Sequence, residues 1–310
     1  NLESDQPQKD FTIGIIDDVT NRSLPSLPDV VPQDPGMTQC KFWGLGSDGT
    51  VGANKNSVNI INTGTKKYAQ AYFEYDAKKS FGVTKSHLRL SKKPIRSSSY
   101  VKNADFVACH NERFIYLYDI VDEIKEGGTL LLNCSYIKDD LSKYLPNKVK
   151  KMIADKNINL WMIDATKIAY ELGLGSHTNT VLQAAFFRVC PLMDVEKALT
   201  YMKDAAIKSY SKKGDKVVNM NIAAIEKGAE LVMRVSIPED WKDVVVEEEV
   251  EDETLPEVVR KIANPINRQH GDDLPVSAFK GYEDGVIDLG LTAYEKRGIA
   301  VKIPSWDKEN

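Results

Sequence analysis

The chain has 310 residues and a formal net charge of −4, with 42% hydrophobic and 28% charged residues. This length predicts about two domains and enough apolar material for a buried core. A sequence pI near 5.7 argues against non-specific nucleic-acid binding, which needs a basic surface. The sequence has no signal peptide and no long apolar span, so we expect no membrane segment and a cytoplasmic or organelle-matrix protein.

Strand-like and helix-like patterns follow one another along the chain. Residues 10–25 predict one strand that ends in a loop, and residues 25–36 predict a proline-rich linker. Further strands are expected at 38–46, 68–77, 104–111, 129–135 and 159–165. Helices are expected at 57–64, 113–128, 141–157, 166–175, 180–189, 195–214 and 216–231.

Most of the expected strands are apolar on both faces and alternate with helices, which is typical of a parallel sheet covered on both sides. We therefore expect an α/β fold with a doubly wound, mostly parallel sheet and helices on both faces. The acidic stretch that begins at about Asp243 predicts a solvated connector, and the residues after it a small irregular C-terminal module.

The four cysteines, Cys40, Cys109, Cys134 and Cys190, are widely spaced and mostly lie in apolar runs. The sequence has no C-x-x-C pair that could supply adjacent ligands for zinc or an iron–sulfur cluster. We therefore expect buried free thiols and no metal site.

The main candidate site is a glycine loop between the strand at 38–46 and the helix that follows. Gly44, Gly46 and Gly49 have the G-x-G-x-x-G spacing. Glycines permit positive φ and a close approach to the backbone, and the start of a helix attracts anions. The loop lacks the Gly-Lys-Ser/Thr ending of a P-loop. The pattern favours a phosphate-bearing ligand, and a tight turn with packing glycines is the alternative.

Side chains around this loop add to the prediction. Ser47, Thr50 and Asn54 offer hydrogen bonds, and Lys55 is placed to reach a diphosphate. Asp48 argues against a pyrophosphate directly on the loop unless its carboxylate turns away, because like charges repel.

A dinucleotide-binding fold needs an acidic residue at the end of its second strand. Glu74 and Asp76 lie near that position, so an NAD or FAD site also fits the spacing. Other candidates are weaker: His87 and His110 are more easily explained as packed or surface residues. Arg89 and Arg96 either bind an anionic ligand or belong to a solvated basic loop. Residues 173–180 form a second glycine loop that either lines a cleft or caps a helix.

Residues 44–57, 82–111 and 173–187 together resemble the gamma-type domain of pyruvate:ferredoxin (flavodoxin) oxidoreductases. Residues 291–310 are similar to the small Glu-Lys-Arg module of that family, and residues 10–25 to the end of its transketolase C-terminal-like domain. The resemblance implies three parts. Residues 1–35 are the end of the preceding domain and a linker, 36–242 the gamma-type domain, and 243–310 the acidic connector and the Glu-Lys-Arg module.

The resemblance also implies an activity for a larger parent protein. Pyruvate, coenzyme A and oxidised ferredoxin give acetyl-CoA, CO2 and reduced ferredoxin. Thiamine diphosphate and [4Fe-4S] clusters are bound by other domains of the parent chain, which is expected to be a homodimer that passes electrons to ferredoxin or flavodoxin. This segment has no catalytic residue, is expected to be inactive alone, and contributes coenzyme A binding and inter-domain assembly. If the source is a eukaryote, the expected location is an organelle such as a hydrogenosome.

By motif match, the resemblance assigns to coenzyme A a set of residues in the glycine loop and its helix. They are Gly44, Gly46, Ser47, Asp48, Gly49, Thr50, Asn54 and Lys55. His110 and Asn111 are expected to form a second wall. Tyr294, Lys296, Arg297 and Trp306 are expected to dock the C-terminal module against neighbouring domains. Two alternatives stay open: a free-standing Rossmann-type dehydrogenase and a structural spacer.

Overall fold

The computed structural model describes residues 3, 5–25, 36–78, 81–135, 141–247, 252–295 and 303–308. The chain divides into a smaller unit, Asn1–Pro32 with Glu248–Gly298, and a larger unit, Gln33–Glu247 with Ile299–Asn310. Most of the expected proline-rich linker and the middle of the acidic connector lie outside the described residues.

A seven-stranded sheet with the order β2-β3-β1-β4-β5-β6-β7 forms the centre of the larger unit. Its strands are β1 (Met37–Leu45), β2 (Tyr68–Tyr75), β3 (Val83–Ser91), β4 (Ala104–Cys109), β5 (Ile124–Asn133), β6 (Asn159–Ile163) and β7 (Met233–Arg234). The strands β1, β4, β5 and β6 are parallel, whereas β3 runs antiparallel to β1 and β2, and β7 antiparallel to β6. The expected α/β fold is confirmed, with a sheet that is parallel in its centre.

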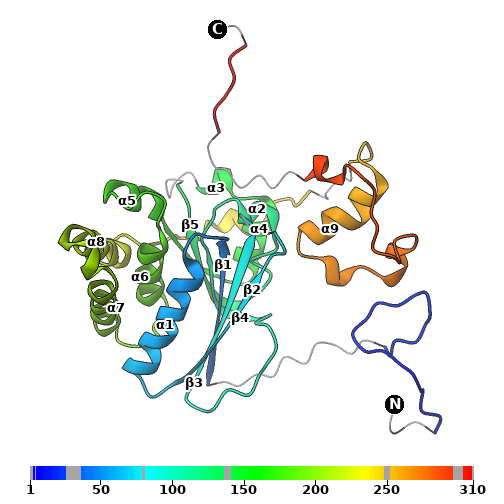
Figure 1. The fold of residues 1–310 in the computed structure, drawn as a ribbon, viewed down its shortest axis with the longest axis horizontal. Coiled ribbons are helices and arrows are strands. Elements are labelled where there is room, and N and C mark those ends of the chain that lie inside the picture. The colour runs from blue at the N-terminus through cyan, green and yellow to red at the C-terminus, as the bar shows by residue number, and fades with distance from the viewer. Residues whose placement is uncertain are drawn as a thin grey trace. The chain divides into compact units, whose positions relative to one another are not determined.

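Helices cover both faces of this sheet (Figure 1). One face carries α1 (Thr50–Gly64), α5 (Ala165–Glu171), α6 (Asn179–Val189), α7 (Val195–Tyr210) and α8 (Asp215–Glu230). The other carries α2 (Phe114–Leu117), α3 (Leu141–Tyr144), α4 (Asn147–Asp155) and the 3-10 turn η3 (Glu239–Lys242). Each layer buries its own apolar cluster against the sheet, and this burial is the main stabilising contribution to the fold.

The helix α6 lies directly on the sheet and is buried along most of its length. The ring of Phe186 lies 5.0 Å from that of Phe42 on β1 and 5.1 Å from that of Phe106 on β4. On its other side α6 meets α8 at Gly228, where a Cβ atom would collide with the backbone of Val181. The glycine therefore permits a close helix–helix approach that a larger residue would prevent.

Two expectations in the middle of the chain are wrong. The residues from 83 to 91, where no strand was expected and Arg89 was considered part of a basic loop, form β3, which pairs with β2 and β1. Residues 113–128, expected as one helix, are helical only over α2, and β5 already begins at Ile124. Gly127 does not end a helix here but adopts a φ of 69° within the strand, and its amide bonds to the carbonyl of Lys156.

Other differences concern the ends of elements. Residues 10–25 form no strand; they make a single bridge between Thr12 and Ser23, and Ile13 is largely exposed. The first helix starts at Thr50, earlier than expected, and 141–157 is divided into α3 and α4, with Pro146 at the start of the second. The remaining expected strands and helices match the observed elements to within a few residues.

The smaller unit consists of short helical segments and turns. They are η4 (Val259–Ala263), α9 (Asn264–Asn267), η5 (Gly271–Asp273), η6 (Val276–Phe279) and η7 (Leu291–Tyr294). The N-terminal segment belongs to this unit: the amide of Val276 donates to the carbonyl of Ile16, and the Ser277 hydroxyl donates to Asp18 over 2.6 Å. The unit is therefore built from segments at opposite ends of the chain.

Three further findings concern the cysteines, membrane spans and the expected docking residues. All four cysteines are buried and free. Within the described ranges, no helix combines the length and the apolar character needed to cross a bilayer. Of the four expected docking residues, Tyr294 and Trp306 are exposed, and Lys296 and Arg297 lie outside the described residues.

Candidate ligand-binding site

The topology places a candidate site at the carboxyl ends of β1 and β4. From β1 the chain passes through α1 to β2 and β3 on one side of β1, whereas β4 lies on the other side. This reversal of direction is where open α/β sheets bind their ligands. The glycine loop follows β1 at this point, and His110 follows β4.

Local packing and backbone conformation explain why glycines occur in the loop. A Cβ atom on Gly44, in β1, would lie 2.6 Å from the Thr50 hydroxyl, and one on Gly49 would lie 2.9 Å from Asn179 of α6. Gly49 has a φ of 87° and Ser47 a φ of 74°, so the loop turns through the left-handed region twice. The amide of Gly46 donates to the carbonyl of Gly82 over 2.7 Å. These contacts support a tight turn with packing glycines, but they do not use every amide of the loop.

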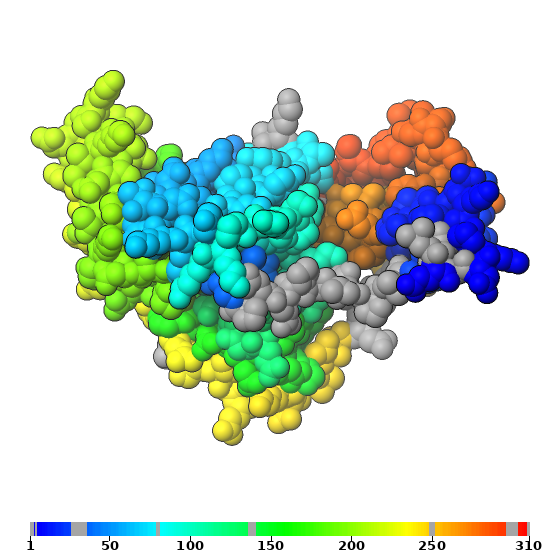
Figure 2. All heavy atoms as spheres, turned by 90° about the horizontal axis from the view of Figure 1, so that it is seen from below, coloured from blue at the N-terminus to red at the C-terminus, as the bar shows by residue number. Residues whose placement is uncertain are grey.

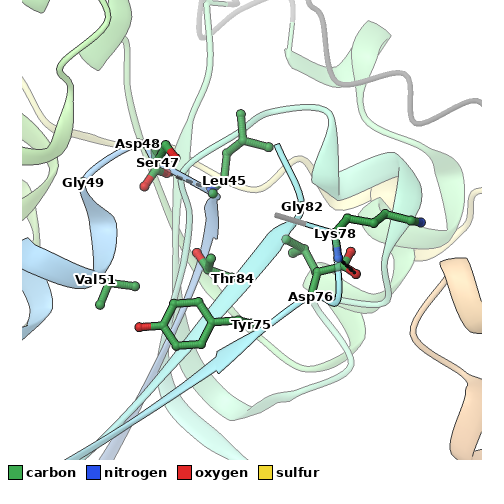
Figure 3. Close-up of a pocket in the computed structure, with 12 residues that line it drawn as sticks. Leu45, Ser47, Asp48, Gly49, Val51, Tyr75, Asp76, Lys78, Gly82 and Thr84 are labelled. Atoms are coloured by element: carbon green, nitrogen blue, oxygen red, sulfur yellow. Dashed lines mark hydrogen bonds between the residues drawn. The ribbon is translucent and has the colours of Figure 1, made fainter. Parts of the chain in front are cut away.

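Asp48 turns its carboxylate into the loop (Figure 3). The amides of Leu45 and Thr50 donate hydrogen bonds to it of 2.8 and 2.7 Å, and the Thr50 hydroxyl donates a third of 2.8 Å. The carboxylate thus satisfies the first amide of α1 and complements the positive end of the helix dipole. The next two amides, of Val51 and Gly52, make no hydrogen bond within the described part of the chain.

His110 connects the two strand ends. Its Nδ1 lies 2.7 Å from the Thr50 hydroxyl, its carbonyl accepts a hydrogen bond from the side chain of Asn133, and its amide donates to the carbonyl of Trp43. Burial lowers the pKa of the ring below its usual value, and the nearby charge of Asp48 opposes that shift only in part. The imidazole is therefore neutral at pH 7.

Two cavities adjoin the glycine loop. The first, the edge crevice, has a volume of about 580 Å³ and lies at the carboxyl ends of the parallel strands. It is lined by Leu45, Asp48, His110, Asn111, Glu112, Asn133, Cys134, Ser135, Asp164, Thr166, Lys167, Tyr170, Ser176 and Thr178. Asn133, which ends β5, Ser135, which follows it, and Asp164, which follows β6, were not singled out from the sequence, although their position at the ends of apolar runs was the available signal.

The second, the hairpin cavity, has a volume of about 450 Å³ and lies between the glycine loop and the turn that joins β2 to β3 (Figure 3). It is lined by Leu45, Gly46, Ser47, Asp48, Gly49, Val51, Tyr75, Asp76, Lys78, Gly82, Val83 and Thr84. The helix α1 contacts β2 and β3, and Figure 2, seen from the opposite end of the sheet, shows these blue and cyan segments side by side. The hydroxyl of Thr84 is buried and has no partner in the described part of the chain.

The structure brings most of the ten sequence-derived site residues together, but not all. Gly46, Ser47, Asp48 and Gly49 line the hairpin cavity, while Asp48, His110 and Asn111 line the edge crevice. Thr50 is buried between them. Gly44 is buried in β1, and Asn54 is buried in α1 outside both linings. Lys55 is exposed, with its ammonium 5.3 Å from the centre of the Phe73 ring.

The residues expected to support NAD or FAD are placed differently. Glu74 lies on β2, which is separated from β1 by β3, and its carboxylate bonds to His87 and Lys85. Burial raises the pKa of Glu74, but the hydrogen bonds from His87 and Lys85 outweigh it and bring the pKa to about 2. Asp76 does line the hairpin cavity. The ribose-binding acid of a Rossmann site is therefore not in its usual position, at the end of a strand next to β1.

Arg89 is not part of a solvated loop. It is buried in β3 and donates hydrogen bonds to Gln39, Gln70 and the carbonyl of Tyr100. His87 is also buried, as a packed histidine. The described residues include no group of three or more His, Cys, Asp or Glu side chains that could hold a metal ion.

Comparisons with known proteins agree with this architecture. Residues 39–231 match the sequence model described as pyruvate ferredoxin/flavodoxin oxidoreductase, and residues 246–300 match the EKR domain, described as a domain of unknown function. The whole chain is 47% identical to the pyruvate:ferredoxin oxidoreductase of Moorella thermoacetica and 45% identical to the pyruvate-flavodoxin oxidoreductase of Enterobacter agglomerans. It covers 26% of the length of each, so it spans about a quarter of these relatives.

One solved structure supports the fold alone. The pyruvate oxidoreductase subunit PORC of Thermotoga maritima superposes with a TM-score of 0.52 at 21% identity. The superposition covers 65% of this chain and 99% of that subunit.

Proposed function

The chain belongs to the pyruvate ferredoxin/flavodoxin oxidoreductase family, and from this membership we propose that its larger unit binds coenzyme A for such an enzyme. In the complete enzyme, pyruvate, coenzyme A and oxidised ferredoxin would give acetyl-CoA, CO2 and reduced ferredoxin. The segment described in this structure would supply the coenzyme A site and contacts between domains, and no group that reacts with pyruvate.

The observation that carries this proposal is the pair of cavities on either side of the glycine loop, at the switch point of the sheet. Coenzyme A joins a phosphate-rich nucleotide to a long uncharged arm, so it needs an extended site with two kinds of lining. The unpaired amides of Val51 and Gly52 suit an anion, and the neutral His110 and Asn111 suit an uncharged group.

The rest of the chemistry would lie elsewhere in the complete enzyme. Thiamine diphosphate forms the reactive carbanion when bound, and iron–sulfur clusters carry the electrons away. The four buried cysteines of this chain do not form a ligand set for a cluster, so we assign these cofactors to other domains. We also propose ferredoxin or flavodoxin as the acceptor, a homodimeric enzyme and a location in the cytoplasm or an organelle matrix.

We propose three parts for the chain, namely the end of a preceding domain at 1–35, the gamma-type domain at 36–242, and the connector and Glu-Lys-Arg module at 243–310. The larger compact unit supports the second part. The contacts between Asp18 and Ser277 indicate that the first and third parts associate with each other. The proposed role of both in assembly is consistent with their exposed apolar side chains, such as Ile13 and Leu289.

Titration calorimetry on the full-length protein tests the proposal. We expect saturable binding of coenzyme A and no binding of NADH, because Glu74 is committed to His87 and Lys85. Binding of NADH without binding of coenzyme A would show a dehydrogenase instead. Binding of neither would show that the domain is a structural spacer.

A further inference from the structure

The hydrogen bonds around Thr50 fix the positions of two protons. The Thr50 hydroxyl has one proton, and it donates that proton to the carboxylate of Asp48. The 2.7 Å contact between the Thr50 oxygen and Nδ1 of His110 must then use a proton on the imidazole. Asp48 therefore selects, through Thr50, the His110 tautomer with its proton on Nδ1.

The other ring nitrogen is left as a bare acceptor. A neutral imidazole that is protonated on Nδ1 has a lone pair on Nε2. This atom makes no hydrogen bond within the described residues, although His110 is only 9% exposed and lines the edge crevice. This nitrogen is not among the fully enclosed unpaired side-chain atoms of the described residues, so it is open to the crevice, where a hydrogen-bond donor of a ligand can reach it.

The charges of the edge crevice favour an uncharged ligand group. Its lining includes three carboxylates, Asp48, Glu112 and Asp164, and one ammonium, Lys167. Glu112 accepts hydrogen bonds from the amide and hydroxyl of Ser135. A phosphate placed here would meet more negative than positive charge, whereas an N–H or O–H donor would not be repelled.

The hairpin cavity is lined by two carboxylates, Asp48 and Asp76, and one ammonium, Lys78. The Asp48 carboxylate, however, is turned toward the amides of Leu45 and Thr50. What this cavity has and the edge crevice lacks is the start of α1.

Val51 lines the hairpin cavity at the start of α1, where two helix amides are unpaired. Lys55 lies one helical turn further along α1 and is exposed. An anion is stabilised at this end of the helix by the dipole, by the unpaired amides and by the nearby ammonium.

We propose that Nε2 of His110 accepts a hydrogen bond from the uncharged pantetheine arm of coenzyme A in the edge crevice, while the phosphates lie on the hairpin side of the glycine loop. This inference rests on the proposed function and assigns each half of the ligand to its own cavity. His110 would contact the ligand directly. Thr50 and Asp48 would be positioning residues that keep the acceptor facing the crevice.

Two fragments of coenzyme A test the two cavities separately. Pantetheine has the uncharged arm without phosphates, and 3′,5′-ADP has phosphates without the arm. In the full-length enzyme, His110→Phe is expected to raise the inhibition constant of pantetheine about three- to tenfold, the effect of one lost hydrogen bond. The constant for 3′,5′-ADP should not change. His270→Phe, in the smaller unit, is the matched control and should alter neither constant.

A second variant keeps the imidazole and removes only the positioning contact. Thr50→Val is nearly isosteric, and it should weaken pantetheine about twofold or more without affecting 3′,5′-ADP. Nitrogen-15 NMR of histidine-labelled enzyme, with the His110 signal identified by its loss in His110→Phe, should show the Nδ1–H tautomer. In Thr50→Val the signal should shift toward a mixture of tautomers.

The outcomes distinguish a failure of the proposed function from a failure of the pantetheine assignment. If coenzyme A itself does not bind, the proposed function fails. The assignment of the pantetheine arm fails, with the function intact, if coenzyme A binds but both variants leave the pantetheine constant unchanged or alter 3′,5′-ADP instead. An imidazolium or an Nε2–H tautomer in the unmodified enzyme at pH 7 would overturn it as well.

Discussion

Replacing Asp48 with alanine removes the acceptor of three hydrogen bonds at the start of α1. A hydrogen bond to a charged group contributes about 1.5–3 kcal/mol, and the loss of a helix cap costs about 0.5–2 kcal/mol. The Thr50 hydroxyl can donate to His110 after the change, so only the two amide bonds are lost outright. We expect the free energy of unfolding to fall by about 2–4 kcal/mol, a smaller loss than three full bonds because Asp48 is only half-buried.

Urea unfolding monitored by tryptophan fluorescence measures this loss, because Trp43, Trp161 and Trp241 all lie in the larger unit. Asp194→Ala is the matched control: Asp194 caps α7 through one hydrogen bond, to the amide of Lys197, and the loss there should be about 1 kcal/mol. If the Asp48 variant is no less stable than this control, the carboxylate does not hold the loop in the way described.

Three other changes test separate features. Gly228→Ala should destabilise the larger unit by about 2–4 kcal/mol, because its Cβ atom would collide with the backbone of α6. Gly52→Ala, which has open space around its Cβ position, should raise the stability by about 0.5–1 kcal/mol. Thermal unfolding compares the two variants, and equal effects would contradict the described packing. Burial lowers the pKa of His87, so the unfolded chain binds a proton below about pH 6.5 that the folded chain excludes. The free energy of unfolding measured with urea should therefore fall between pH 7 and pH 5, by up to about 1.4 kcal/mol per pH unit for this ring, and a rise would refute the sign. Lys55→Ala should weaken coenzyme A binding to the full-length protein by about 1–3 kcal/mol if the ammonium contacts a phosphate. The control is Lys208→Ala, which changes an exposed lysine of α7, and an equal loss of affinity in that variant would mean that only net charge matters.

Apolar runs in the sequence were enough to predict the parallel centre of the sheet. The strands β1, β4, β5 and β6 each contain a short apolar run, and the helices α6 to α8 have amphipathic or fully apolar patterns, so the local signal and the final burial agree. The prediction failed at β3, where the polar residues Arg89, His87 and Lys85 give no strand signal. His87 and Arg89 are buried, and Lys85 is half-buried, because partners on β2 and β1 and in the segment before β4 satisfy them.

The sequence predicted only the part of the site that depends on neighbouring residues in the chain. The glycine spacing between a strand and a helix located the loop, and His110 was placed at the end of its strand. The role of Asp48 was open, because its sequence position fixes the charge but not the direction of the side chain. The structure turns it toward two amides of its own loop, where it caps α1.

The sequence by itself therefore determined the class of fold, the family and the position of the glycine loop, because these depend on local periodicity and on residues that are neighbours in the chain. Only the tertiary structure decided that Thr50 and His110, 60 positions apart, share a hydrogen bond, and that two cavities lie on either side of the loop. The physical reason is that a proton position or a cavity depends on groups brought together by strand order, and no local pattern records which strands become neighbours.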